Sequence, residues 1–402
     1  MSIFKEIPPT SGFPLFLKYF LSTFKSGSLE EDLKNYLGVK FIRMVYSGTA
    51  ALYLILESLK NLSNKTTVII PSYVCLLVPL AIKRAGLKVE VCDIRRDSLD
   101  FDSRELENLC SQNSDVLAVV AVHLAGIPVD LEAIDKVVRK HGIFIIEDCA
   151  QALGATYKGK KVGTFGDFSF FSLCRGKGLT IYEGGAAATF KKEFAEILDT
   201  KIETFVKDDF FSEGLKIAEL FGYWIFYRPL LFWFVFNFPQ IFWNLRGNKL
   251  KALTEYFTVD FPIHKISKFR KSIGHASFYR LEEEIEKQRE KASFYINGLK
   301  ETTGIRIIKE PPDTKASYPY VTLIFDDLAM RNKALRKFKN SGLGVSQIYA
   351  YAITEYDYLK QIVPNRNFPA ARYLAEHEIT LSTSTFLRKE ELDLILDTIK
   401  RL

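Results

Sequence analysis

Short apolar runs and amphipathic stretches alternate along the chain from about residue 40 to residue 200. The apolar runs have the length of buried strands, and the stretches between them repeat their hydrophobic positions with the period of a helix. This alternation predicts βαβ units and a mostly parallel sheet. Strands are expected at 67–71, 88–94, 116–123 and 143–147, and helices at 49–62, 76–85 and 131–140.

The pattern changes after residue 204. Residues 205–262 do not alternate, whereas residues 276–299 form a long charged segment with helical spacing. A strand is expected at 320–325, and helices at 329–340 and from Lys389 onward. We therefore divide the chain into an N-terminal arm (1–39), a large α/β domain (40–204), an aromatic-rich insertion (205–262) and a small C-terminal α+β domain (263–402).

The composition is that of an ordinary globular protein. Of 402 residues, 48% are hydrophobic and 26% are charged, which excludes a disordered or fibrous chain. The net charge of +7 is too small over this length to indicate nucleic acid binding. The five cysteines are odd in number and form no CxxC pair, which argues against a disulfide framework or a bound metal and favours a reducing cytoplasm. Prolines and charges interrupt the N-terminal residues, so no signal peptide is expected.

Two motifs in the large domain carry candidate chemistry at the ends of predicted elements. SGTAAL at 47–52 puts a glycine and a hydroxyl residue at a helix start, where free N–H groups and the helix dipole favour a phosphate. A simple helix cap is the alternative. EDCAQ at 147–151 places an acidic pair at the end of a strand, where parallel sheets bind ligands. A carboxylate there can keep a pyridinium nitrogen protonated, or can merely cap a helix.

A third motif surrounds Lys177, which lies in the glycine-flanked turn CRGKGL five residues after Ser172. The glycines permit a close approach of a cofactor. A lysine whose pKa is lowered by burial or by a cationic neighbour can form a Schiff base with an aldehyde. Lys177 is therefore the best candidate for a nucleophilic amine among the lysines of the chain, most of which are expected on the surface.

Taken together, these motifs resemble the DegT/StrS family of pyridoxal phosphate (PLP)-dependent sugar aminotransferases. The resemblance implies the fold of aspartate aminotransferase (fold type I): a large domain with a mostly parallel seven-stranded sheet between helices, plus a smaller C-terminal α+β domain. It also implies a homodimer that moves an amino group from glutamate to a nucleotide-linked or lipid-linked keto-sugar, for cell-surface glycan or lipid biosynthesis. The family-like phrases are SGTAAL at 47–52, PSY at 71–73, HLAGIPVDLEAI at 123–134, EDCAQALGATYKGKKVGTFGDFSFFS at 147–172 and KGL at 177–179.

The same resemblance implies a role for each matching residue. Lys177 would bind the cofactor covalently and shuttle a proton, Asp148 would pair with the pyridine nitrogen, and Gln151 would contact the ring hydroxyl. A lysine at this position argues against the sugar dehydratases of the family, which have a histidine there. The phosphate would be held by Gly48, Thr49, Ala50 and Ser172.

The chain departs from the family pattern at three places near this site. Cys75 stands where an aromatic ring usually stacks on the cofactor, so either Cys75 packs on the cofactor or Tyr73 takes that place. Cys174 stands where a histidine is common, and we expect an inert thiol. The Asn-Tyr-Arg stretch that reaches the partner subunit's phosphate has no clear copy. Its equivalent offers His264 or Lys265 as a phosphate contact, with a hydrogen-bonded loop histidine as the alternative.

The largest departure is the aromatic segment 222–245, which contains all three tryptophans and has Arg228 as its only charge. Its uncharged run is at the short limit for a spanning helix and is interrupted by polar residues, so we expect no membrane span. A hairpin in the plane of the membrane surface is favoured, because aromatic rings suit the headgroup level and residues 246–271 hold seven basic and two acidic side chains. Residues 14–24 offer a second interfacial helix. Packing of both segments on each other or across a dimer is the alternative.

These features predict a cytoplasmic protein that associates peripherally with the inner face of the membrane. Two other interpretations stay open: a non-catalytic PLP-fold scaffold or sensor at the membrane, and an aminotransferase for a hydrophobic non-sugar carbonyl compound. The intact set of Lys177, Asp148 and Gln151 disfavours the scaffold. An NAD-dependent enzyme is disfavoured because no GxGxxG follows a strand.

Overall fold

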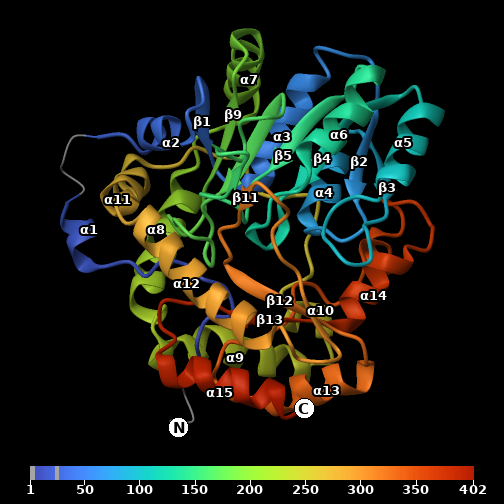
Figure 1. Ribbon diagram of the computed structural model, residues 1–402. Helices are drawn as coiled ribbons and strands as arrows, with labels where there is room; N and C mark the ends of the chain where they lie inside the picture. Colours follow the sequence, from blue (N-terminus) through green and yellow to red (C-terminus); the bar gives the residue numbers. More distant parts are fainter. Residues whose placement is uncertain (1–4, 23–26) are drawn as a thin grey trace.

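A computed structural model describes residues 5–22 and 27–402. Its main feature is a seven-stranded sheet with the order β1-β9-β8-β5-β4-β2-β3 (Figure 1). Five neighbouring strands are parallel, and β9 is antiparallel to both β1 and β8. The predicted mostly parallel seven-stranded sheet is thereby confirmed. The strands are β1 (Phe41–Val45), β2 (Thr67–Pro71), β3 (Lys88–Cys92), β4 (Val116–Val122), β5 (Phe144–Asp148), β8 (Phe168–Ser172) and β9 (Gly185–Thr189).

The central strands are buried because they supply side chains to two hydrophobic cores. In β4, Leu117 and Val120 join one core while Val119 and Ala121 join the other. A strand covered on both faces needs a continuous apolar run, which explains the sequence VLAVVAV. The helices that accompany the sheet are α2 (Leu29–Leu37), α3 (Gly48–Leu59), α4 (Leu77–Arg84), α5 (Ser103–Gln112), α6 (Leu131–Val138) and α7 (Lys192–Phe205).

A smaller antiparallel sheet, β10-β12-β13, lies toward the C-terminal end of the chain. The predicted helix at 276–299 is two helices, because the chain turns at Tyr279–Arg280, where the Arg280 guanidinium donates to Tyr19 Oη at 3.2 Å. A third sheet, β11-β6-β7, links the two parts of the chain. The elements are β6 (Thr156–Tyr157), β7 (Lys160–Lys161), β10 (Ile305–Ile307), β11 (Thr314–Lys315), β12 (Tyr320–Phe325), β13 (Glu378–Ser382), α11 (Lys268–Phe278), α12 (Leu281–Leu299), α13 (Leu328–Phe338), α14 (Pro369–His377) and α15 (Lys389–Lys400).

The aromatic-rich insertion folds as three helices, α8 (Phe210–Phe226), α9 (Pro229–Leu245) and α10 (Lys249–Ala252). Asp209 caps α8 by accepting from the Ser212 N–H at 2.9 Å, and Pro229 begins α9, where its fixed φ and missing donor suit a first turn. In Figure 1, α9 runs along the end of the molecule near α15. In the described ranges, no helix combines the length and apolar character needed to cross a bilayer.

Residues 5–15, which we call the N-terminal strap, connect the two parts of the molecule. The Ile7 and Ser11 N–H groups donate to Gly342 O and Pro319 O, and the Phe13 N–H donates to Gly178 O. The strap leads into α1 (Leu17–Leu21), a shorter helix than the one expected at 14–24, of which residues 23 and 24 lie outside the described residues. The Phe20 ring of α1 stacks on Phe221 of α8 with centroids 4.7 Å apart, so α1 packs against the insertion.

Candidate active site

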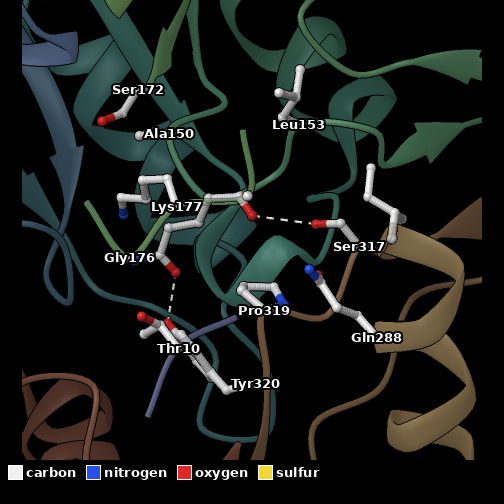
Figure 2. Close-up of a pocket in the computed structure, with 13 residues that line it drawn as sticks. Thr10, Ala150, Leu153, Ser172, Gly176, Lys177, Gln288, Ser317, Pro319 and Tyr320 are labelled. Atoms are coloured by element: carbon white, nitrogen blue, oxygen red, sulfur yellow. Dashed lines mark hydrogen bonds between the residues drawn. The ribbon is translucent and has the colours of Figure 1, made fainter. Parts of the chain in front are cut away.

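Lys177 lies in a small pocket at the turn that follows β8 (Figure 2). Gly176 has a φ of +76°, and a Cβ there would approach Thr10 Oγ1 of the N-terminal strap to 2.9 Å. Both the positive φ and the close approach of Thr10 therefore favour glycine at this position of the turn. Ser172, Ala150 and Gln151 share the pocket with Lys177.

Asp148 ends β5 as a buried carboxyl group. One of its oxygens accepts the Ala150 N–H at 2.9 Å. Burial raises the pKa of Asp148 to about 6, and the positive charge of Lys177 partly offsets this effect. A buried carboxyl group whose pKa is close to neutral pH, and which forms no ion pair with any described residue, suits a positively charged ring nitrogen.

Gln151 lies in the turn that follows β5, and its side chain is held by two donors. Its side-chain oxygen accepts the Ala125 N–H at 3.0 Å and the Tyr320 hydroxyl at 2.6 Å, the lower dashed contact in Figure 2. Its amide NH₂ group then remains to donate to a ligand oxygen.

An anion cradle lies at the start of α3, beside Ser172. A Cβ on Gly185 would come within 2.4 Å of the Ser47 and Gly48 backbone, and one on Gly48 would lie 3.2 Å from Ser172 Cβ. The Ala50 N–H is used by the Ser47 cap at 3.1 Å, whereas the Gly48 and Thr49 N–H groups have no hydrogen-bond partner among the described residues. The first turn thus retains donors for a phosphate.

Cys75 lies near Tyr349, a residue outside the sequence motifs. Its pKa is raised by burial, with Lys177, Asp148 and the hydroxyl of Tyr349 among the groups that influence it. Tyr73 donates to Tyr349 O at 3.0 Å and accepts from the Tyr349 N–H, and the two rings meet edge to face at 5.4 Å. Tyr349, rather than Tyr73, is therefore the ring that reaches the Cys75 side of the site.

The two candidates for the missing Asn-Tyr-Arg stretch lie apart from the pocket. His264 is buried against the Tyr46 ring at a centroid distance of 4.2 Å, and its Nδ1 lies 3.0 Å from Lys265 O. Lys265 pairs with Asp208 at 2.8 Å. Within this chain neither side chain lines the pocket of Lys177. Burial, followed by the charge of Glu183, raises the pKa of Cys174 to about 12, so its thiol stays protonated, as expected for an inert group.

A second group of potential ligands, His123, Glu147 and Cys149, lies behind the site. His123 Nε2 contacts Glu147 at 3.2 Å, and Nδ1 accepts the Val129 N–H. Glu147 also accepts three backbone N–H groups at 2.7 Å each. The His123 and Glu147 atoms already have partners, so these two residues form a structural hydrogen-bond network.

Several pocket residues escaped the sequence motifs because they come from distant segments. Thr10 belongs to the N-terminal strap and Gln288 to α12. Ser317 lies in the loop before β12, and Tyr320 is the first residue of β12. The tyrosine-rich stretch 349–358 was the one available signal for Tyr349.

The residues in and around the pocket fit PLP on chemical grounds. Lys177 offers an amine, buried Asp148 an anion for the ring nitrogen, Gln151 a donor, and the start of α3 with Ser172 an anion cradle. These are the groups that the aldehyde, pyridine ring and phosphate of PLP require.

Comparisons with known proteins agree with this chemistry. An uncharacterised protein of Methanocaldococcus jannaschii is 37% identical to this chain over 172 residues, which cover 43% of this chain and 44% of that protein. The UDP-4-amino-4,6-dideoxy-N-acetyl-beta-L-altrosamine transaminase of Campylobacter jejuni is 25% identical over 378 residues, with 93% of this chain and 89% of that protein covered. The GDP-perosamine synthase of Escherichia coli O157:H7 is 36% identical over 38% of this chain and 42% of its own length.

Solved structures show the same fold over nearly the whole chain. The Helicobacter pylori aminotransferase PseC, involved in the biosynthesis of pseudoaminic acid, has a TM-score of 0.76 at 20% identity, with 99% of both chains covered. A Streptococcus pneumoniae aminotransferase in its PLP form has the same TM-score at 22% identity, with 98% of both chains covered.

The description of the matching family model is DegT/DnrJ/EryC1/StrS aminotransferase family, and the match covers residues 20–210 and 261–400. The predicted family, the fold type I architecture, the aminotransferase class and PLP as cofactor are confirmed. The chain belongs to the DegT/DnrJ/EryC1/StrS aminotransferase family.

Proposed function

We propose that this protein transfers an amino group from glutamate to a keto-sugar, for the biosynthesis of a cell-surface glycan or lipid. One observation carries the proposal: Lys177 lies close to the buried carboxyl of Asp148 and shares its pocket with Ser172, beside the open start of α3. The transaminase and synthase relatives act on nucleotide-linked amino sugars by name, which supports a keto-sugar acceptor, nucleotide-linked or lipid-linked.

Each residue of the site has a distinct task in this proposal. Bound PLP supplies an electron sink for the carbon that loses a proton. The Lys177 amine would hold the cofactor aldehyde and would be the base that moves a proton at the substrate carbon. The Asp148 carboxylate balances the charge of the ring nitrogen, and the Gln151 NH₂ group donates to the ring oxygen. The phosphate would be held by the Gly48 and Thr49 N–H groups, the start of α3 at Ala50 and the Ser172 hydroxyl.

We further propose a homodimer whose site is completed by the partner. His264 Nε2 is buried without a hydrogen-bond partner among the described residues, next to Tyr46 and hence near the phosphate cradle. His264 is a candidate for the cross-subunit phosphate contact, as is Lys265 if it is released from Asp208. Cys75 and Tyr349 are candidates for the contact with the face of the cofactor ring. The same proposal divides the chain after residues 39, 204 and 262. It also places the protein in the cytoplasm, peripherally on the inner membrane face.

The test is a half-reaction of the purified holoenzyme with glutamate, followed by visible absorbance. We expect conversion of the bound cofactor to its amine form, and conversion back when a keto-sugar nucleotide is added. Lys177→Ala should bind the cofactor without the lysine-dependent absorbance and should not convert it. A wild-type holoenzyme that leaves glutamate untouched would favour a scaffold or sensor. Reversal by a hydrophobic carbonyl compound and by no sugar would favour the non-sugar acceptor.

A further inference from the structure

The insertion helix α9 presents an apolar surface to solvent along its whole length. None of its residues is fully buried, although it has the most hydrophobic composition of any long helix in the described chain. Phe238 is 55% exposed and Leu245 is 83% exposed. Exposed residues recur at the spacing of one helix face, which we call the α9 face: Leu230, Leu231, Val235, Phe238, Ile241 and Leu245.

The opposite side of α9 is fastened to the N-terminal strap. The Asn237 side chain donates to Glu6 Oε2 at 2.8 Å, and the Glu6 N–H donates to Pro229 O at 2.8 Å. Asn237 thus turns toward the protein, whereas the apolar side chains of the α9 face turn toward solvent, the reverse of an ordinary surface helix. The three tryptophans, which we expected at a headgroup level, are half-buried.

Basic side chains border the C-terminal end of the α9 face. Arg246 lies 4.2 Å from the centroid of Phe242, and Lys251 lies 4.7 Å from the Trp243 ring. Lys249 is also exposed, and residues 226–254 contain no Asp or Glu. An apolar strip with cations at its edge is complementary to a membrane surface that carries negative headgroups.

We propose that the α9 face docks on an anionic lipid bilayer, with the helix axis in the plane of the membrane. A helix of 17 residues is about 25 Å long, enough for a stable in-plane contact. The family model leaves residues 211–260 unmatched, so the family pattern does not account for the sequence of this surface. In a symmetric contact with a second copy, the same segment would offer no acidic partner to these cations. The α9 face would be the surface through which the protein binds the membrane at the peripheral location proposed above. This inference does not rest on the transamination chemistry.

Vesicle co-sedimentation of the full-length holoenzyme tests this surface. We expect the wild type to sediment with phosphatidylglycerol-containing vesicles and to bind pure phosphatidylcholine much more weakly. Phe238→Glu/Ile241→Glu should abolish sedimentation, whereas the control Leu328→Glu, at a 40% exposed leucine of α13, should sediment like the wild type. Arg246→Gln/Lys249→Gln/Lys251→Gln should weaken binding to the anionic vesicles roughly a hundredfold, since three basic groups each contribute a factor of about five near such a surface.

Circular dichroism and the glutamate half-reaction on the same variants separate docking from folding and catalysis, and neither should change. A wild type that stays in the supernatant with anionic vesicles would overturn the proposal. So would a wild-type oligomer that breaks down in the Phe238→Glu/Ile241→Glu variant without any lipid binding, because a second copy would then cover the face. Equal binding to neutral vesicles would overturn the anionic specificity.

Discussion

Asp148 is the residue whose environment is most directly tied to cofactor binding. Its folded-state pKa of about 6 lies above the ordinary value of 3.8 because burial penalises the charged form. Without cofactor, the protonated state therefore stabilises the fold at low pH, and this stabilisation is lost as the pH rises through about 6. The cost of ionised Asp148 at neutral pH is about 3 kcal/mol at most.

A cationic ring nitrogen should recover this cost. We expect the cofactor-induced rise in melting temperature to be larger at pH 7.5 than at pH 5, with a transition near pH 6. Differential scanning fluorimetry of the apo and holo forms across this range measures the effect. Asp148→Asn should bind the cofactor more weakly and flatten the profile, so an unaltered pH dependence in Asp148→Asn would assign the transition to another group.

Single residues also mark the limit of what the motifs could predict. Lys177, Asp148 and Gln151 were predictable because they follow strands of one sheet whose carboxyl ends share an edge. Tyr349 and Tyr320 were not, because they reach the site from segments about two hundred residues away, and nothing local specifies that approach. Their placement depends on how the small sheet packs on the large one.

The first turn of α8 is anchored by a buried ion pair. Arg270 of α11 donates to both carboxylate oxygens of Glu213 at 2.7 and 2.5 Å, and also to Glu183 O. Burial alone would raise the pKa of Glu213, but hydrogen bonds from Arg270 and Ser267 outweigh it and lower the value. The pair thus joins the insertion to the segment that backs the anion cradle.

Removing one partner of this pair should be far more damaging than removing both. We expect Arg270→Met to lower the free energy of unfolding by about 3–5 kcal/mol, because Glu213 would stay buried without its cation. Arg270→Met/Glu213→Leu should recover most of that loss. Urea unfolding of the single and double variants measures the coupling, and strictly additive losses would show that the two groups act independently.

A second element, the loop at 349–358, is held by the end of the insertion. Glu255 accepts the Ala350 N–H at 3.1 Å and the Tyr356 hydroxyl at 2.6 Å, and its backbone oxygen accepts from Tyr358. From the other side, Glu378 accepts the Ile348 N–H at 2.7 Å. Tyr349 lies between these two anchors.

Loss of the Glu255 carboxylate should loosen Tyr349. We expect Glu255→Ala to cost about 2 kcal/mol of stability, since two buried donors lose their acceptor, and to weaken cofactor binding several-fold. Asp260→Ala, at an exposed position in the same segment, serves as the control. Equilibrium dialysis of PLP and urea unfolding measure the two effects. Unchanged cofactor affinity in a destabilised Glu255→Ala would limit Glu255 to a structural role.

The helices of the insertion were beyond prediction for a physical reason. Strands and helices elsewhere were recognised by one apolar face, as in α6, where Ile134 and Val138 recur at helical spacing. In α9 apolar residues occupy every side, and Pro239 inside the helix disfavours a helical assignment. The periodicity on which the other elements depend is therefore missing.

At the scale of the whole molecule, the N-terminal strap connects the large and small sheets. Ile7 is fully buried, and the strap's Pro8 carbonyl accepts the Ser382 hydroxyl at 2.7 Å. Ile7→Ala should lower the free energy of unfolding by about 2–5 kcal/mol, the usual cost of emptying a buried isoleucine site. Leu17→Ala, at a position 51% exposed, should change it little. Guanidinium titration distinguishes these outcomes, and equal losses would contradict the assignment.

The strap also limits how early in folding the structure can be completed. The strap contacts Ser382, Thr383 and Glu391, which lie far from it in the sequence. During synthesis, the strap must wait without these partners until the segment that contains Ser382 and Thr383 has left the ribosome. Closing so long a loop is slow. The cofactor pocket should therefore gain its Thr10 wall late in folding, only after Ser382 and Thr383 have become available to the strap.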